Sequence, residues 1–364
     1  MCDLSGHTVP NMMRFHISHL ACLAAIIGAV FGAAPPVAAH QMTHVVFPGQ
    51  SIQRAVDAAE PGDTVLVTPG TYRESVKVST PGITLSGTGR ETVIEPATTK
   101  AGSPCAEAGN GICVIGTKDH DVEGVTVASL TVTGFTGSGV FAMATDGLTV
   151  RNVTAVRNGV WGIAQERSVR GVFRKNTARD NGDAGLFLAN TVKEEAGAAD
   201  TRGTVVEHNR LEGNRIGITV RRLRNLTVAG NHLTGNCAGV FVVGDENKPR
   251  AGALTVRDNT VVKNNKSCPK TARLDALQGS GIVLTGAEDT LVTQNRVIGN
   301  TGNSPLSGGI VLFKSFVGTT SERNRITDNT LEGNAPADIV NTDAGKDNTF
   351  EHNVCRASKP AGMC

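Results

Sequence analysis

The stretch Leu226-Thr-Val-Ala-Gly-Asn231 decides the fold, because it recurs as Leu254-Thr-Val-Arg-Asp-Asn259 and as Thr290-Leu-Val-Thr-Gln-Asn295. Each copy carries a second asparagine five residues after the first. The spacing N-x4-N occurs six times, at positions 176/181, 209/214, 231/236, 259/264, 295/300 and 329/334. The chain is therefore built from one repeated unit.

The period of this repeat is 22 to 24 residues, and insertions lengthen some copies to between 28 and 36 residues. A short period with two turns per copy is typical of a chain coiled into stacked rungs, each stable only between its neighbours. The sequence predicts an all-β, right-handed parallel β-helix, with a single domain over 40–364. Residues 40–100 would form the N-terminal cap and first rungs, and 122–355 the asparagine-anchored rungs.

Alternation of apolar and polar residues separates the two faces of each expected strand. Leu226, Val228 and Val242 point inward on this pattern, whereas Thr227 and Phe241 point outward. We interpret the asparagines as turn residues that stack and hydrogen-bond along the coil.

One short helix is expected at the N-terminal end of the coil. Ser51 is suited to cap it, and Ile52 and Val56 lie on one helical face, so the helix would cover the exposed end of the coil.

The first 39 residues have the features of a signal peptide. A basic segment precedes an apolar run over 20–34, and small residues at 37–39 suit cleavage after Ala39. The run is short for a membrane span, which needs about 20 residues, although an uncleaved anchor is an alternative. We expect a secreted or periplasmic protein with no membrane span.

Six cysteines follow the predicted cleavage site, an even number that suggests disulfides in an exported protein. Their spacing favours Cys105 with Cys113 and Cys355 with Cys364, which leaves Cys237 for Cys268. No CxxC pair supports a zinc site.

The charge is nearly balanced, with 35 basic and 33 acidic residues, so the sequence predicts no nucleic-acid partner. No cofactor is expected. Acidic residues at Asp245 and Glu246, or at Glu194, Glu195 and Asp200, are candidate Ca²⁺ ligands, although no twelve-residue calcium loop is present. We expect a monomer.

The segment from Ser51 to Glu74, followed by Ile83-Thr-Leu-Ser-Gly-Thr-Gly89, resembles the N-terminal region of the pectin-lyase-like superfamily. With the asparagine-anchored rungs, the resemblance covers essentially all of the mature chain. It implies the β-helix fold and relatives that include uronan lyases, polygalacturonases, epimerases and non-catalytic proteins. The catalytic motifs of these enzymes are incomplete here, since Asn341-Thr-Asp343 and Asp119-His-Asp121 match only fragments of them.

Insertions on both sides of the strands of the form G-aliphatic-x-aliphatic predict a walled groove. Its expected floor has one column with Phe141, Phe187, Thr219, Phe241 and Val311, and another with Met143, Glu166, Ala189, Arg221, Val243 and Phe313. The candidate substrate-binding residues are Phe187, Phe241, Arg221 and Arg222, and the candidate catalytic residues are Glu166, Arg221 and Lys314. Loops that fold over the phenyl rings are the alternative.

Two functional hypotheses remain from the sequence. In the first, a secreted β-helix binds an extracellular or cell-envelope acidic polysaccharide, and cleavage or epimerisation of uronate sugars could follow from a base beside a cation. In the second, a non-catalytic surface or periplasmic scaffold presents the walled face to a protein partner. An open floor favours the first and a sealed floor the second.

Overall fold

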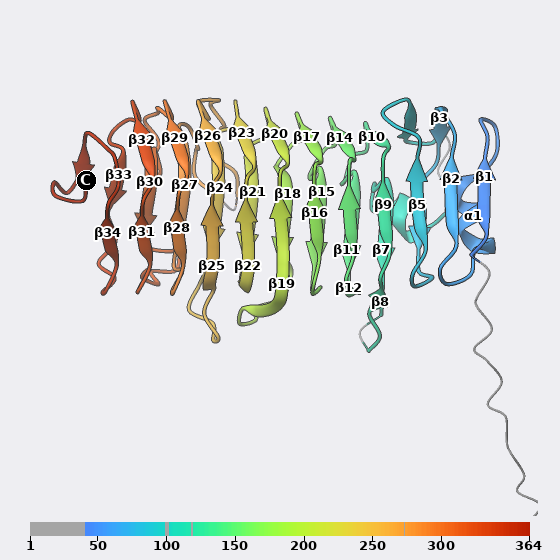
Figure 1. Cartoon of the computed structure of the whole chain (residues 1–364), viewed down its shortest axis with the longest axis horizontal. Coiled ribbons are helices and arrows are strands. Elements are labelled where there is room, and N and C mark those ends of the chain that lie inside the picture. Colours follow the sequence, from blue (N-terminus) through green and yellow to red (C-terminus); the bar gives the residue numbers. More distant parts are fainter. Residues whose placement is uncertain (1–40, 99–101, 118, 273) are drawn as a thin grey trace, which may run out of the picture. The chain divides into compact units, whose positions relative to one another are not determined.

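A computed structural model describes residues 41–98, 102–117, 119–272 and 274–364, and the predicted signal peptide lies outside these residues. The described chain coils through three long parallel sheets, here called A, B and C, which run side by side along the stack (Figure 1). No helix in the described ranges is long and apolar enough to span a membrane. The predicted all-β parallel β-helix is confirmed.

Sheet A has twelve strands: β1 (Thr43–Val46), β2 (Thr64–Val67), β5 (Thr84–Gly87), β9 (Thr126–Ala128), β13 (Thr149–Arg151), β16 (Val172–Arg174), β19 (Ala199–Glu207), β22 (Leu223–Ala229), β25 (Gly252–Arg257), β28 (Leu291–Thr293), β31 (Arg325–Thr327) and β34 (Thr349–Glu351). Sheet B has ten strands: β3 (Gly70–Arg73), β6 (Thr92–Glu95), β10 (Thr131–Thr133), β14 (Thr154–Val156), β17 (Thr177–Arg179), β20 (Arg210–Glu212), β23 (His232–Thr234), β26 (Thr260–Val262), β29 (Arg296–Ile298) and β32 (Thr330–Glu332).

Sheet C has eleven strands: β4 (Val76–Val78), β7 (Ile112–Ile115), β11 (Val140–Met143), β15 (Ile163–Glu166), β18 (Ala184–Ala189), β21 (Ile216–Arg221), β24 (Ala238–Val243), β27 (Ser280–Thr285), β30 (Gly308–Phe313), β33 (Ile339–Asn341) and β35 (Ser358–Lys359). A small sheet of β8 (Val122–Glu123) and β12 (Thr145–Asp146) lies outside these three, and the helices are α1 (Ile52–Ala58) and α2 (Pro104–Glu107).

Two asparagine ladders hold the turns between the sheets. Side-chain amides bond from rung to rung at 2.8–3.1 Å, one ladder running from Asn176 to Asn353 and the other from Asn158 to Asn300 and on to Asn334. Each amide also bonds to backbone of a neighbouring rung, so the buried polar groups of the turns are satisfied. The interpretation of these residues as turn architecture is confirmed.

The core lies inside the coil and contains the side chains predicted to point inward, among them Leu226, Val228 and Val242. Helix α1 forms where expected. The Ser51 hydroxyl accepts from the backbone N–H of Arg54, and Ile52 and Val56 are buried in the core. That α1 protects the end of the coil from association stays a prediction.

Three disulfides join the cysteines in the predicted pairs, Cys105 with Cys113, Cys237 with Cys268 and Cys355 with Cys364.

Candidate functional site

The outward face of sheet C carries the two columns expected from the sequence. Strand register aligns Phe141, Ala164, Phe187, Thr219, Phe241, Val283 and Val311 in the first. It aligns Met143, Glu166, Ala189, Arg221, Val243, Thr285 and Phe313 in the second. The alternation rule therefore placed these side chains correctly.

The first column is covered over most of its length, which is one of the two arrangements that the sequence allowed. Phe187 is 7% exposed and Phe241 is 2% exposed. Both belong to a second apolar cluster, outside the coil, that includes Cys237, Cys268 and Leu277. The loops pack on the rings because burying apolar surface is favourable, so the alternative of covering loops is the one observed.

Glu166 and Arg221 lie two strands apart in sheet C, about 10 Å by strand spacing. The segment at 191–192 crosses between them. Arg221 donates to the carbonyl of Thr191 at 3.0 Å and of Val192 at 3.4 Å, and the Val192 backbone N–H bonds to the Glu166 carboxylate. Both side chains thus anchor this loop.

Burial raises the pKa of the Glu166 carboxyl above its ordinary value. The Val192 hydrogen bond and the charges of Arg167, Arg221 and Lys193 oppose this rise. Glu166 is consequently a half-buried carboxyl among three cations.

Arg222 is buried and paired with loop residues, and its role in substrate binding stays a prediction. Its guanidinium pairs with Glu195 at 2.5 Å, contacts Asp245 and donates to the carbonyl of Glu194 at 2.9 Å. The acidic residues considered as Ca²⁺ ligands are in part engaged by this cation. Within the described ranges, no group of three or more His, Cys, Asp or Glu residues is arranged to hold a metal ion.

Lys314 is exposed but remote from the other catalytic candidates. It follows Phe313, which lies five strands along sheet C from Glu166, about 24 Å by strand spacing. The structure does not bring Lys314 together with Glu166.

A partly exposed patch remains on the N-terminal part of this face. It is formed by the exposed Arg167 and by four residues of intermediate exposure, Phe141, Met143, Trp161 and Glu166. Trp161 stacks on Phe187 with ring centroids 4.2 Å apart and donates from Nε1 to Asp183 at 3.1 Å. Arg167 contacts the Met143 sulfur at 3.0 Å. We call these five residues the open patch.

Trp161 was missed as a site residue in the sequence. It is the chain's single tryptophan, and it stands two residues before β15, whose outward side faces this surface. A single tryptophan next to a strand whose alternate side chains point to solvent is the sequence signal that could have identified Trp161 as a site residue.

Comparison with known proteins decides the handedness and the fold group. A family profile described as "Right handed beta helix region" matches residues 81–261, and one described as "Periplasmic copper-binding protein (NosD)" matches 190–359. The chain is a right-handed parallel β-helix of the pectin-lyase-like fold. No curated protein matches the sequence.

Solved structures share this β-helix at low sequence identity. The A-module of Azotobacter vinelandii mannuronan C-5 epimerase AlgE4 is 20% identical, with a TM-score of 0.54 over 83% of this chain and 90% of that one. DFA-IIIase from Arthrobacter chlorophenolicus A6 is 10% identical, with a TM-score of 0.59 over 86% of this chain and 98% of that one. At such identities the likeness shows the fold.

Copper, named by the second family description, prefers thiolate, thioether and imidazole ligands. The six cysteines at 105–364 are paired in disulfides, and the described residues contain no group of three or more His, Cys, Asp or Glu that could hold a metal ion. The paired cysteines supply no thiolate ligand for copper.

Proposed function

We propose that this β-helix acts outside the cytoplasm and binds an acidic polysaccharide at the open patch. The observation that carries the proposal is Glu166, a half-buried carboxyl whose pKa is influenced by Arg167, Lys193 and Arg221. An excess of cations around one carboxyl favours carboxylated sugars, because guanidinium and ammonium groups pair with carboxylates.

The apolar residues of the patch suit the C–H faces of a sugar ring, whereas the cations suit its carboxylate. Trp161 is held by its stack on Phe187 and by its bond to Asp183, so its ring is preorganised. Sugar rings have apolar C–H faces that pack on such aromatic surfaces. The patch thus combines one fixed indole with cationic groups.

Cleavage or epimerisation of a uronate requires a group that removes a proton and a cation that stabilises the resulting anion. Glu166 and Arg167 are our candidates for these two roles, and a raised pKa makes the carboxyl a better proton acceptor once it is ionised. Mannuronan, the polymer named for the AlgE4 neighbour, is the first ligand to test.

The test is calorimetric titration of the protein with oligomannuronate, oligogalacturonate and a neutral glucan. Arg167→Ala should weaken binding of both uronates about tenfold and leave any binding of the glucan unchanged, whereas Trp161→Ala should weaken binding of all ligands. Lys314→Ala is the matched control, because Lys314 is an exposed cation remote from the patch. Glu166→Gln should abolish any release of unsaturated products or change in epimer ratio.

The second hypothesis is a non-catalytic scaffold that presents the loop-covered C-terminal part of the same face to a protein partner. If neither uronate binds, or if Lys314→Ala weakens binding as much as Arg167→Ala, the proposal for the open patch is wrong and the scaffold is the better account.

A further inference from the structure

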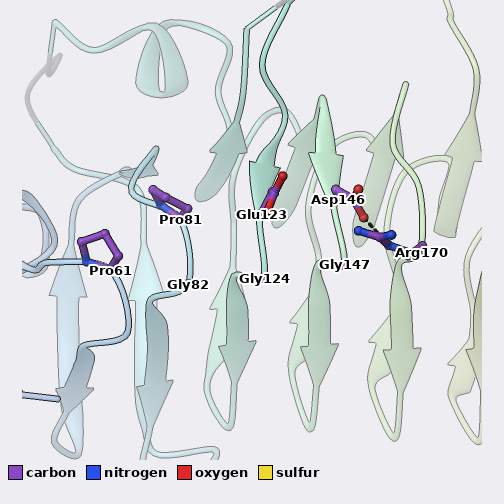
Figure 2. Close-up of a pocket in the computed structure, with 8 residues that line it drawn as sticks. All are labelled: Pro61, Pro81, Gly82, Glu123, Gly124, Asp146, Gly147 and Arg170. Atoms are coloured by element: carbon purple, nitrogen blue, oxygen red, sulfur yellow. Dashed lines mark hydrogen bonds and ion pairs between the residues drawn. The ribbon is translucent and has the colours of Figure 1, made fainter. Parts of the chain in front are cut away.

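A groove of about 420 Å³ crosses the corners where the chain passes from sheet C to sheet A. It is lined by Pro61, Pro81, Gly82, Glu123, Gly124, Asp146, Gly147 and Arg170, which follow one another along the stack of turns (Figure 2). It lies outside the open patch and shares no residue with it.

The floor of the groove is bare backbone. Gly62, Gly82, Gly124 and Gly147 occupy the same left-handed corner of successive rungs, with φ of 96°, 71°, 64° and 69°. A positive φ favours glycine but does not require it in this protein. The same corner is occupied further along the coil by Arg170, Asn225, Ala253, Asp289, Arg323 and Asp347, at φ of 49° to 58°, and in one rung by Gly203 at 85°.

Crowding does not explain the glycines at 124 and 147 either. A Cβ on Gly124 would approach no closer than 3.8 Å to the Gly82 Cα, and one on Gly147 no closer than 3.9 Å to the Gly124 nitrogen. These are ordinary van der Waals distances. What distinguishes the first rungs is that four successive corners carry no side chain, which leaves room for a ligand to approach the backbone.

One wall of the groove carries hydrogen-bonding groups that the protein does not use itself. Asp146 is 8% exposed, and its Oδ1 accepts from Arg170 Nε at 2.6 Å (Figure 2). Its Oδ2 accepts no hydrogen bond from any residue in the described ranges. The exposed Glu123 carboxylate on the adjacent rung has no ion-pair partner among those residues. The two Nη groups of Arg170 do not bond to any of them either. Asp146 Oδ2, the Glu123 carboxylate and the two Nη groups of Arg170 are therefore available to hydrogen-bond a molecule in the groove.

We infer that this groove binds an uncharged glycan strand running along the coil. Sugar hydroxyls donate to the carboxylates of Glu123 and Asp146, and sugar oxygens accept from the Nη groups of Arg170. The rings of Pro61 and Pro81 and the bare glycine backbone pack on the C–H faces of the sugars. The groove holds two carboxylates against one guanidinium, which disfavours a uronate and separates this ligand from that of the open patch.

The test uses uncharged β-linked hexasaccharides of glucose, mannose, galactose and N-acetylglucosamine, with hexamannuronate as the charged comparison. At least one uncharged hexasaccharide should bind. Gly124→Asn, which places a side chain on the floor, should weaken that binding about tenfold or more. Glu123→Gln tests the wall without changing the backbone and should also weaken it.

Gly235→Asn is the matched control. Gly235 and Gly124 share a φ of 64° and have the same 3.8 Å clearance for a Cβ, but Gly235 is not part of the groove. Equal melting temperatures of the two variants show that lost binding is not lost folding. The inference is overturned if no uncharged hexasaccharide binds, if only hexamannuronate binds, or if Gly124→Asn and Glu123→Gln both bind like the wild type. Trp161→Ala should leave this binding intact, so failure of the groove and failure of the open patch are distinguishable.

Discussion

At the scale of single residues, the stacked asparagines satisfy polar groups that the coil would otherwise bury. Asn231 shows the pattern: its Oδ1 accepts from the backbone N–H and from Nδ2 of Asn209, and its own Nδ2 donates to Val206 O and to Asn259 Oδ1. All four bonds lie inside the protein, where an unpaired donor or acceptor costs free energy. The ladder therefore couples each rung to the next.

Asn231→Ala should destabilise the protein strongly. The change leaves two donors of Asn209 without partners, at about 1–3 kcal/mol for each buried group, and removes the side-chain bond to the carbonyl of Val206. We expect a loss of about 3 kcal/mol or more in the free energy of unfolding, measured by denaturant titration. Asn303→Ala, at an exposed asparagine, is the control and should change stability by less than about 0.5 kcal/mol. A small effect at Asn231 would show that water replaces the amide.

At the scale of elements, α1 is fixed to the first rungs by both charge and packing. Glu74 accepts from the backbone N–H groups of Ile52 at 2.7 Å and Gln53 at 3.1 Å, at the helix N-terminus. On the other side, Ile52 and Val56 enter the core and the helix contacts β1, β2 and β4. These contacts position α1 at the N-terminal rungs.

Ile52→Asp should separate α1 from these rungs, because it buries an unpaired charge where the wild-type side chain is fully enclosed. We expect a lower melting temperature and more aggregation, measured by light scattering during heating, since a coil end without its cover exposes strand edges. Arg54→Asp adds a carboxylate to the exposed side of the same helix and should behave like the wild type. Equal aggregation of all three proteins would refute a protective role for α1.

The positions of residues within the strands and turns were predictable from the sequence, whereas the packing of the loops was not. Leu226, Val240 and the asparagines follow local rules of alternation and turn chemistry, so their places were predictable. The burial of Phe187 and Phe241 depends on how the long loops fold back, and no local rule fixes that. The same is true of Arg222, whose partners Glu195 and Asp245 come from two different loops.

At the scale of the whole β-helix, one face of sheet C is divided into two parts. Its N-terminal part carries the partly exposed open patch, whereas in its C-terminal part loops bury Phe241, Val283 and Val311 in a second apolar cluster outside the coil. The Cys237–Cys268 disulfide lies in this cluster and ties the loop at 265–279 to β24. The loop also pairs with itself through Cys268 and Leu277, with N–H to O distances of 2.9 and 3.1 Å.

The double variant Cys237→Ala/Cys268→Ala tests whether the loops that cover sheet C unfold independently of the coil. Without the covalent tie the loop loses about 2–4 kcal/mol of stabilisation, and the ladder and the interior core are untouched. Amide hydrogen exchange should therefore rise in 265–279 and in 238–243, and it should stay unchanged in the sheet B strands. Cys355→Ala/Cys364→Ala removes a disulfide near the C-terminus, so its exchange should change only there. If the first variant instead exchanges faster along every sheet, the cover and the coil unfold together and the second cluster is part of one cooperative core.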